Sequence, residues 1–240
     1  SGTGLFDAIA NFDNEASIDD SGGISPTGSY EFGGAAGSSF LDLGAVFSVD
    51  FKRHFLTEGF FPSDLFDARG LIDDITDFDG TTALDVNAEM QIAVTQDNPG
   101  SGSPTYTAFQ TFANGTYKGR GFKFKANLIS NDIGQDIKVS QLGYTASLQR
   151  RTEQGNLTSS GAGAKAITFT HPFFVGTSSI LGANTNLPSI GINAQNMASG
   201  DYFEVSSVSG TGFTVHFKNS SNASIDRNFT YQAVGFGKGG

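Results

Sequence analysis

The stretch LDLGAVFSVDF, residues 41–51, alternates apolar side chains with mostly small or polar ones. One face of this pattern is entirely apolar and comprises Leu41, Leu43, Ala45, Phe47, Val49 and Phe51. A period of two is the side-chain spacing of a β-strand that buries one face and exposes the other. The stretch therefore predicts a half-buried strand of an antiparallel sheet.

The same alternation recurs at 84–94, 122–128 and 213–217. In the segment 137–148 the alternation changes phase between Val139 and Leu142, which predicts a β-bulge near Gln141. The chain also holds 32 glycines and 23 phenylalanines among its 240 residues. Many glycines favour short strands joined by turns, and the phenylalanines supply enough apolar surface for folded cores. We therefore predict an all-β fold.

The run RRTEQGNLTSSGAGAK, residues 150–165, is polar, rich in glycine and serine, and almost without apolar residues. Such a composition is typical of a linker between domains. The sequence thus predicts two consecutive antiparallel β-sandwich domains of jelly-roll-like type. We place the first at residues 1–150, the linker at 151–163, and a second, smaller sandwich at 164–240.

Charge is distributed unevenly along the chain. Residues 1–79 carry 15 acidic and 3 basic side chains, whereas residues 80–240 carry 9 acidic and 11 basic ones. An amino-terminal third of net charge −12 repels nucleic acid and anionic lipid, so neither is an expected partner. The sequence has no 18-residue apolar run and does not begin like a signal peptide. We therefore expect no membrane insertion, and synthesis in the cytoplasm.

Residues suited to catalysis or metal binding are few. The chain has no cysteine and three histidines, His54, His171 and His216, and none lies in a motif that places a base beside a nucleophile. We predict no catalytic residues, no cofactor and no metal. Two alternatives stay open: a calcium site among the acids between Asp73 and Asp79, and paired carboxylates that hydrolyse a glycan.

Recognition of a carbohydrate is the positive hypothesis that the residues favour. A sugar site on a β-sandwich needs exposed aromatic faces together with side chains that bind hydroxyl groups. In the second domain the candidate ligand-binding residues are Tyr202, His216, Arg227 and Tyr231, all expected to point outward.

The carboxy-terminal third of the sequence resembles a known group of proteins. The resemblance rests on the segments KAITFTHPFF (165–174), PSIGINAQN (188–196), GDYFEV (200–205), GFTVHF (212–217) and FTYQAVGFGKG (229–239). Their order is similar to the last domain of the host-specificity proteins of long-tailed bacteriophages, also called tail tip attachment or central tail fibre proteins. It is also similar to the H-type lectin-like modules of phage tail fibres.

The stretch from 65 to 128 resembles the module that precedes this domain in those proteins. It also resembles a galactose-binding-like, discoidin-type jelly roll, through the pattern of Arg120, Phe122 and Phe124. The resemblance implies a virion protein of the tail tip, without catalysis, that attaches to a bacterial surface glycan or outer-membrane protein. It further implies contact with other tail proteins and a homotrimer. A purely structural tail or baseplate component is the alternative, followed by a glycan-degrading tailspike.

Overall fold

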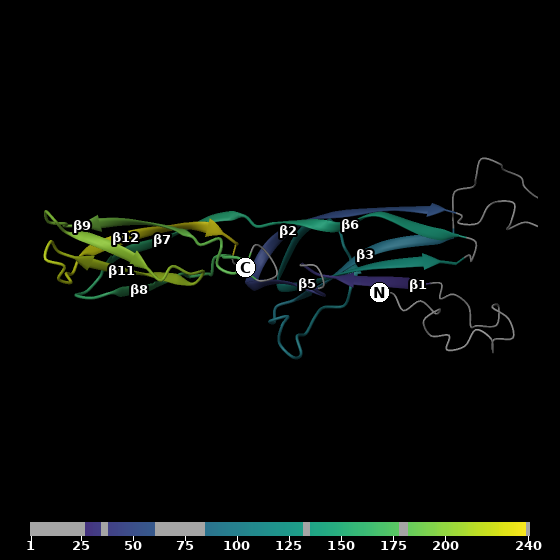
Figure 1. The fold of residues 1–240 in the computed structure, drawn as a ribbon, viewed down its shortest axis with the longest axis horizontal. Helices are drawn as coiled ribbons and strands as arrows, with labels where there is room; N and C mark the ends of the chain where they lie inside the picture. Colours follow the sequence, from purple (N-terminus) through teal and green to yellow (C-terminus); the bar gives the residue numbers. More distant parts are fainter. Residues whose placement is uncertain (1–26, 35–37, 61–84, 132–134, 178–181, 239–240) are drawn as a thin grey trace, which may run out of the picture.

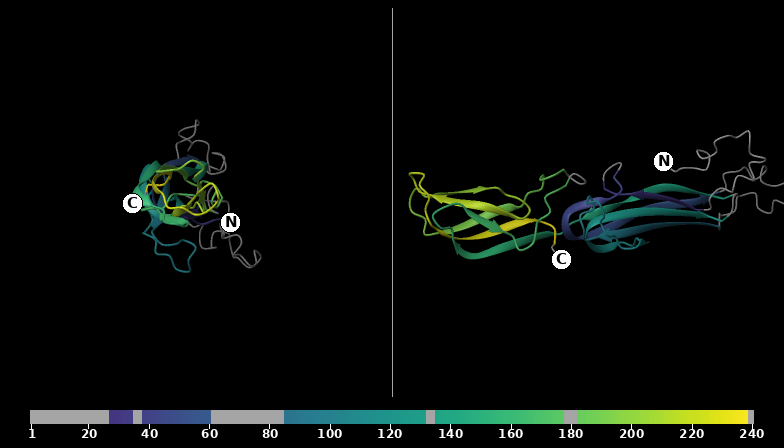
Figure 2. Two further views of the ribbon diagram at one scale, coloured as in Figure 1. Left: turned by 90° about the vertical axis from the view of Figure 1, so that its left-hand side faces the viewer. Right: turned by 90° about the horizontal axis from the view of Figure 1, so that it is seen from below.

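The computed structural model describes residues 27–34, 38–60, 85–131, 135–177 and 182–238. Within these ranges the chain forms twelve strands and no helix, which confirms the predicted all-β class. It follows that no helix of these ranges is long and apolar enough to cross a membrane. The strands form two units that lie end to end along a rod (Figures 1 and 2).

The first unit is built on one antiparallel sheet. Its strands are β1 (Thr27–Phe32), β2 (Leu41–Phe60), β3 (Val86–Thr95), β4 (Gln110–Thr111), β5 (Gly115–Ser130) and β6 (Asp136–Ser147). The hydrogen-bonded order is β4-β3-β5-β2-β6, and β1 pairs with the second half of β5. The described strands of this unit thus belong to one continuous sheet rather than to two separate ones.

The long strand β2 allows this sheet to enclose a core. Its first half pairs with β5, and its second half, from Asp50 onward, pairs with β6. Phe51 lies where the two pairings meet, and its ring centroid is 5.0 Å from that of Phe122 and 5.4 Å from that of Tyr144. The alternation predicted for residues 41–51 is confirmed, because its apolar face is buried with the sole exception of half-buried Ala45.

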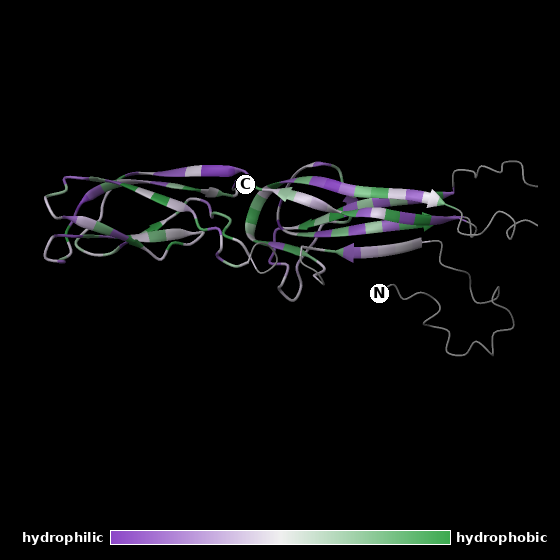
Figure 3. Cartoon of the chain, turned by 45° about the horizontal axis from the view of Figure 1, so that its top comes forward, coloured by the Kyte–Doolittle hydropathy of each residue, from purple (hydrophilic) through white to green (hydrophobic). Residues whose placement is uncertain are grey.

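Two further predictions from the pattern hold in this unit. Figure 3 shows hydrophobic and hydrophilic residues alternating along its strands. The register of β6 on β2 jumps from Gln141 to Val139, so Ser140 is the extra residue of a bulge. The phase change therefore located an irregularity of the ladder to within one residue.

The second unit is a small sandwich of two three-stranded sheets. Its strands are β7 (Arg150–Ser159), β8 (Lys165–Thr168), β9 (Ser189–Gln195), β10 (Tyr202–Ser206), β11 (Gly212–Lys218) and β12 (Asn228–Phe236). One sheet has the order β10-β11-β8 and the other β7-β12-β9. Phe217 of β11 meets Phe229 of β12 across the core, with ring centroids 5.5 Å apart.

The predicted linker at 151–163 is wrong over most of its length. Residues 150–159 form β7, which pairs with β12 from Arg150 opposite Phe236 to Ser159 opposite Asn228. The second unit therefore begins at residue 150 and not at 164.

The sequence pattern did not indicate β7 because the half-buried positions of this strand are not apolar. The guanidinium of Arg151 lies 3.7 Å from the centre of the Phe173 ring and pairs with Glu153, Nη1 to Oε2, at 3.0 Å. Gly155 leaves the space that the ring of Tyr231 fills, since a Cβ there would lie 1.9 Å from Cε1 of that ring. At positions where apolar alternation would predict aliphatic side chains, β7 therefore has an arginine that stacks on a ring and a glycine that makes room for one.

The two units share side-chain and main-chain contacts. Phe174 of the second unit is buried in the core of the first. The main-chain N–H of Ser48 donates to the carbonyl of Lys238 at 3.1 Å. The N–H of Gly237 donates at 3.0 Å to the carbonyl of Gln149, which lies in the segment that connects β6 to β7. These contacts define what is called the junction below.

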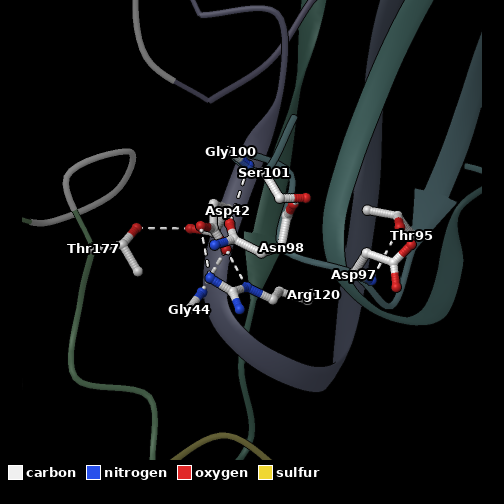
Figure 4. A network of polar contacts seen from close by, with 9 residues as sticks. All are labelled: Asp42, Gly44, Thr95, Asp97, Asn98, Gly100, Ser101, Arg120 and Thr177. Atoms are coloured by element: carbon white, nitrogen blue, oxygen red, sulfur yellow. Dashed lines mark hydrogen bonds and ion pairs between the residues drawn. The ribbon is translucent and has the colours of Figure 1, made fainter. Parts of the chain in front are cut away.

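A polar contact adds to the junction (Figure 4). The hydroxyl of Thr177 donates to the carbonyl of Asp42 at 2.7 Å. The carboxylate of the same aspartate accepts from the main-chain N–H of Gly44 at 2.8 Å and from Nε of Arg120 at 3.1 Å. Asp42 therefore connects β2 to β5 and to the second unit at once.

Candidate functional site

Three connecting loops gather at the end of the second unit that faces away from the first (Figure 1). They are residues 160–164, 196–201 and 219–227, and together they are called the loop end. The pairing explains the grouping: Asn228, where β12 begins, lies opposite both Ser159 and Gln195, where β7 and β9 end. Tyr202, where β10 begins, likewise lies opposite Lys218, where β11 ends.

Arg227 ties these loops together. Its Nη2 lies 2.5 Å from Oδ2 of Asp201, and its Nε lies 3.0 Å from the same oxygen. Its main-chain N–H donates to Oγ of Ser160 at 2.9 Å, while the N–H of Ser160 donates to the Arg227 carbonyl. One predicted ligand-binding residue therefore links all three loops, and its guanidinium already has partners within the chain.

Two carboxylates of the loop end are stabilised in their charged form. The main-chain N–H of Ala198 and the side chain of Arg227 lower the pKa of Asp201. The hydroxyl of Ser159 and the main-chain N–H of Gly161 lower the pKa of Asp226. Hydrogen bonds to the ionised form cause these shifts, so both side chains act as fixed acceptors for the loops.

Tyr202 and His216 lie at the same end and both contact the loop 219–227. The hydroxyl of Tyr202, a side chain that is 38% exposed, donates to Oδ1 of Asn222 at 2.5 Å. Nε2 of His216 lies 2.7 Å from Oγ of Ser224. His216 also points outward as predicted, because Val215 and Phe217 on either side of it are buried.

Tyr231 does not belong to this group, and the prediction that it points outward is wrong. Its ring lies 5.3 Å from that of Phe213 and 6.3 Å from that of Phe169, inside the sandwich. Burial, and then the nearby carboxylate of Glu153, raise the pKa of its hydroxyl. The period of two in FTYQAVGFG already places Tyr231 on the face of the buried Phe229 and Ala233, so the signal was available in the sequence.

The pair formed by His216 and Ser224 has the spacing of a base beside a nucleophile, an arrangement that no motif of the sequence predicted. A third group that orients the histidine is missing among the described residues, where His216 makes no second side-chain hydrogen bond. The carboxylate nearest in register, Glu204, instead pairs with Lys218 at 2.8 Å. The geometry thus supplies two parts of a triad without the third.

Metal binding finds no support in the described ranges, where no three histidine, aspartate or glutamate side chains form a potential metal site. The calcium hypothesis for Asp73 to Asp79 falls outside the described residues. Sequence reasoning missed Asp201, Asn222 and Asp226, although the run NSSNAS at 219–224 marks a polar loop.

Comparison of the chain with models of known protein families, with curated proteins and with solved structures gives no match.

Proposed function

We propose that the chain is a non-catalytic attachment module that recognises a bacterial surface glycan or outer-membrane protein through its loop end. The observation that carries this proposal is the clustering of three candidate residues, Tyr202, His216 and Arg227, on polar loops at the free end of a rod. A recognition surface of this kind needs fixed polar groups and an exposed aromatic ring more than it needs activated groups.

The setting of the module is proposed from the sequence resemblance. It is a tail tip or tail fibre of a long-tailed bacteriophage, where the chain contacts other tail proteins and forms a homotrimer. Three copies would present three loop ends, and avidity would raise a weak single-site affinity by orders of magnitude.

Cell binding tests the proposal. The full chain, labelled with a fluorophore, is mixed with a panel of Gram-negative strains, and binding is measured by flow cytometry. We expect binding to at least one strain, and competition with a phage that adsorbs to that strain. Tyr202→Ala and Asn222→Ala should weaken binding about tenfold, because each removes one anchor of the surface. Gln141→Ala, an exposed change on β6 of the first unit, is the matched control.

Two outcomes favour the alternatives. Failure to bind any strain, or binding that both loop-end variants leave unchanged, supports a purely structural role in the tail. Release of reducing ends from the polysaccharide of a bound strain supports a glycan-degrading tailspike instead. The His216–Ser224 pair is examined separately with a fluorophosphonate probe, which we expect to leave Ser224 unlabelled.

A further inference from the structure

We infer that a groove on the flank of the first unit binds a neutral saccharide. This side groove has a volume of about 830 Å³ and lies between the segment 105–110 and the beginning of β5. Its lining combines two tyrosines, two glutamines and one residue of each charge: Tyr106, Tyr117, Gln96, Gln110, Asp97 and Lys118. None of these residues belongs to the loop end, so the inference concerns a second site and goes beyond the proposed function.

One wall of the side groove is fixed to β3. The main-chain N–H of Thr107 donates to the carbonyl of Val94 at 2.9 Å, and the N–H of Val94 donates to Oγ1 of Thr107 at 3.0 Å. The N–H of Thr105 donates to Oδ2 of Asp97 at 2.8 Å. A wall that is already ordered loses little conformational entropy when a ligand binds, which favours affinity.

The turn that leads into this wall is also fixed. Asn98 accepts from the main-chain N–H of Gly100 at 3.0 Å and from the hydroxyl of Ser101 at 2.7 Å (Figure 4). Pro99 packs on Gly121 of β5, where a Cβ would approach the proline Cβ to 2.9 Å. Glycine at 121 therefore permits the close approach that holds the turn against the sheet.

The two tyrosines supply apolar surface that does not need to reorganise. The hydroxyl of Tyr117 donates to the carbonyl of Ala113 at 2.9 Å, and its ring lies edge-on to Phe51 with centroids 5.9 Å apart. The ammonium of Lys123 lies 4.6 Å from the centre of the Tyr106 ring. Rings held in this way suit the C–H faces of a sugar, because the negative face of an aromatic ring attracts them.

The polar groups of the side groove can both donate and accept. Nε2 of Gln96 donates to the carbonyl of Lys118 at 3.1 Å, which leaves its Oε1 as an acceptor. Within the described part of the chain, the side chains of Gln110 and Lys118 make no hydrogen bond or ion pair. Sugar hydroxyls need partners of both kinds, and this set offers them.

The charges of the groove select a neutral ligand. Asp97 and Lys118 are the charged side chains of its lining, and their charges cancel; the nearby ammonium of Lys123 is not part of the lining and lies against the Tyr106 ring. A site for a phosphate or a polyanion needs an excess of positive charge, and a site for a cation needs the opposite. A neutral polyhydroxylated ligand with apolar ring faces fits both the charge balance and the tyrosines.

Affinity electrophoresis of the full chain tests the inference. Native gels contain dextran, mannan or galactan as neutral probes, and polygalacturonate as the anionic probe. We expect at least one neutral polysaccharide to retard the wild-type chain. The double variant Gln110→Ala/Lys118→Ala should bind that polysaccharide at least tenfold more weakly, and Gln141→Ala should bind it as the wild type does. Both substituted side chains are exposed, so we expect an unchanged melting temperature in circular dichroism.

Three results would overturn the inference: no retardation by any neutral polysaccharide, retardation by polygalacturonate alone, or equal retardation of the double variant and the wild type. The test is independent of the loop end. Tyr202→Ala should be retarded like the wild type even where it binds cells more weakly, so failure at one site is distinguishable from failure at the other.

Discussion

The ring of Phe174 in the second unit packs edge-on against the ring of Phe47 in β2, with centroids 6.0 Å apart and an interplanar angle of 87°. Phe174 is 3% exposed, so a side chain of one unit completes the core of the other. The two units are therefore joined by a buried aromatic contact as well as by the hydrogen bonds of the junction.

The first prediction concerns this contact. Phe174→Ala should lower the free energy of unfolding by about 3–5 kcal/mol, because it removes a buried ring and leaves a cavity. It should also weaken the coupling between the units, so that a single calorimetric transition separates into two. Leu157→Ala is the control, since Leu157 is 54% exposed and the change should leave the transition in place. An unchanged thermogram for Phe174→Ala would show that the contact does not couple the units.

The second prediction separates Tyr231 from Tyr202, two tyrosines that were both expected to point outward. Tyr231→Ala should cost about 2–3 kcal/mol in urea unfolding, because the ring packs among Phe213, Phe169 and the backbone of Gly155. Tyr202→Ala should cost less than about 1 kcal/mol, because its ring lies at the surface. Equal losses for the two variants would contradict the positions described for them.

The third prediction concerns proteolysis at Arg150 and Arg151. A linker would be cut there quickly, whereas β7 pairs with β12 along this segment and should resist trypsin in the folded chain. Mass spectrometry of a timed digest measures the cut, and the same digest in urea shows that both bonds are cleavable once unfolded. Rapid cleavage at these bonds under native conditions would show that the segment is an exposed linker and not a paired strand.

The fourth prediction concerns pH. The pKa of Asp226 is lowered in the folded chain from an ordinary value of 3.8 by the hydroxyl of Ser159 and the N–H of Gly161. The carboxylate therefore stabilises the fold above its unfolded pKa, and this contribution is lost as the pH falls from about 5 through the folded pKa. Asp226→Asn should make the free energy of unfolding less dependent on pH below 5, as measured by urea unfolding. A variant with the same acid dependence as the wild type would exclude this role.

Much of the fold was predictable because the strands that form most of its core alternate apolar and polar side chains with a period of two. The strands containing Phe51, Phe122 and Phe217 all follow from alternation, and the bulge at Ser140 follows from its interruption. Strand β7 could not be found in this way, because its half-buried positions are not apolar. Arg151 stacks its guanidinium on the ring of Phe173, and Gly155 leaves room for the ring of Tyr231. Those partners are close in space and distant in sequence.

The candidate site was predictable only in part. Residue type and alternation identified Tyr202, His216 and Arg227, but the contact of Arg227 with Asp201 and Ser160 depends on the order of the strands in the two sheets. The side groove was missed for a similar reason. Its two walls, at 105–110 and 116–118, come together because Thr107 is hydrogen-bonded to Val94 of β3 and the turn at Pro99 lies against Gly121 of β5.

The direction of the strands has a mechanical consequence. In both units they run along the long axis of the rod (Figure 1). Tension applied at the loop end would act parallel to β7 and β12 and would load their ladder, from Arg150 opposite Phe236 to Ser159 opposite Asn228, in shear. Because ladder hydrogen bonds lie perpendicular to the strands, such a load must break many of them together rather than one after another. A module held by its loop end would thus carry a pulling force along β7 and through residues 148–149 into β6 of the first unit without being unzipped.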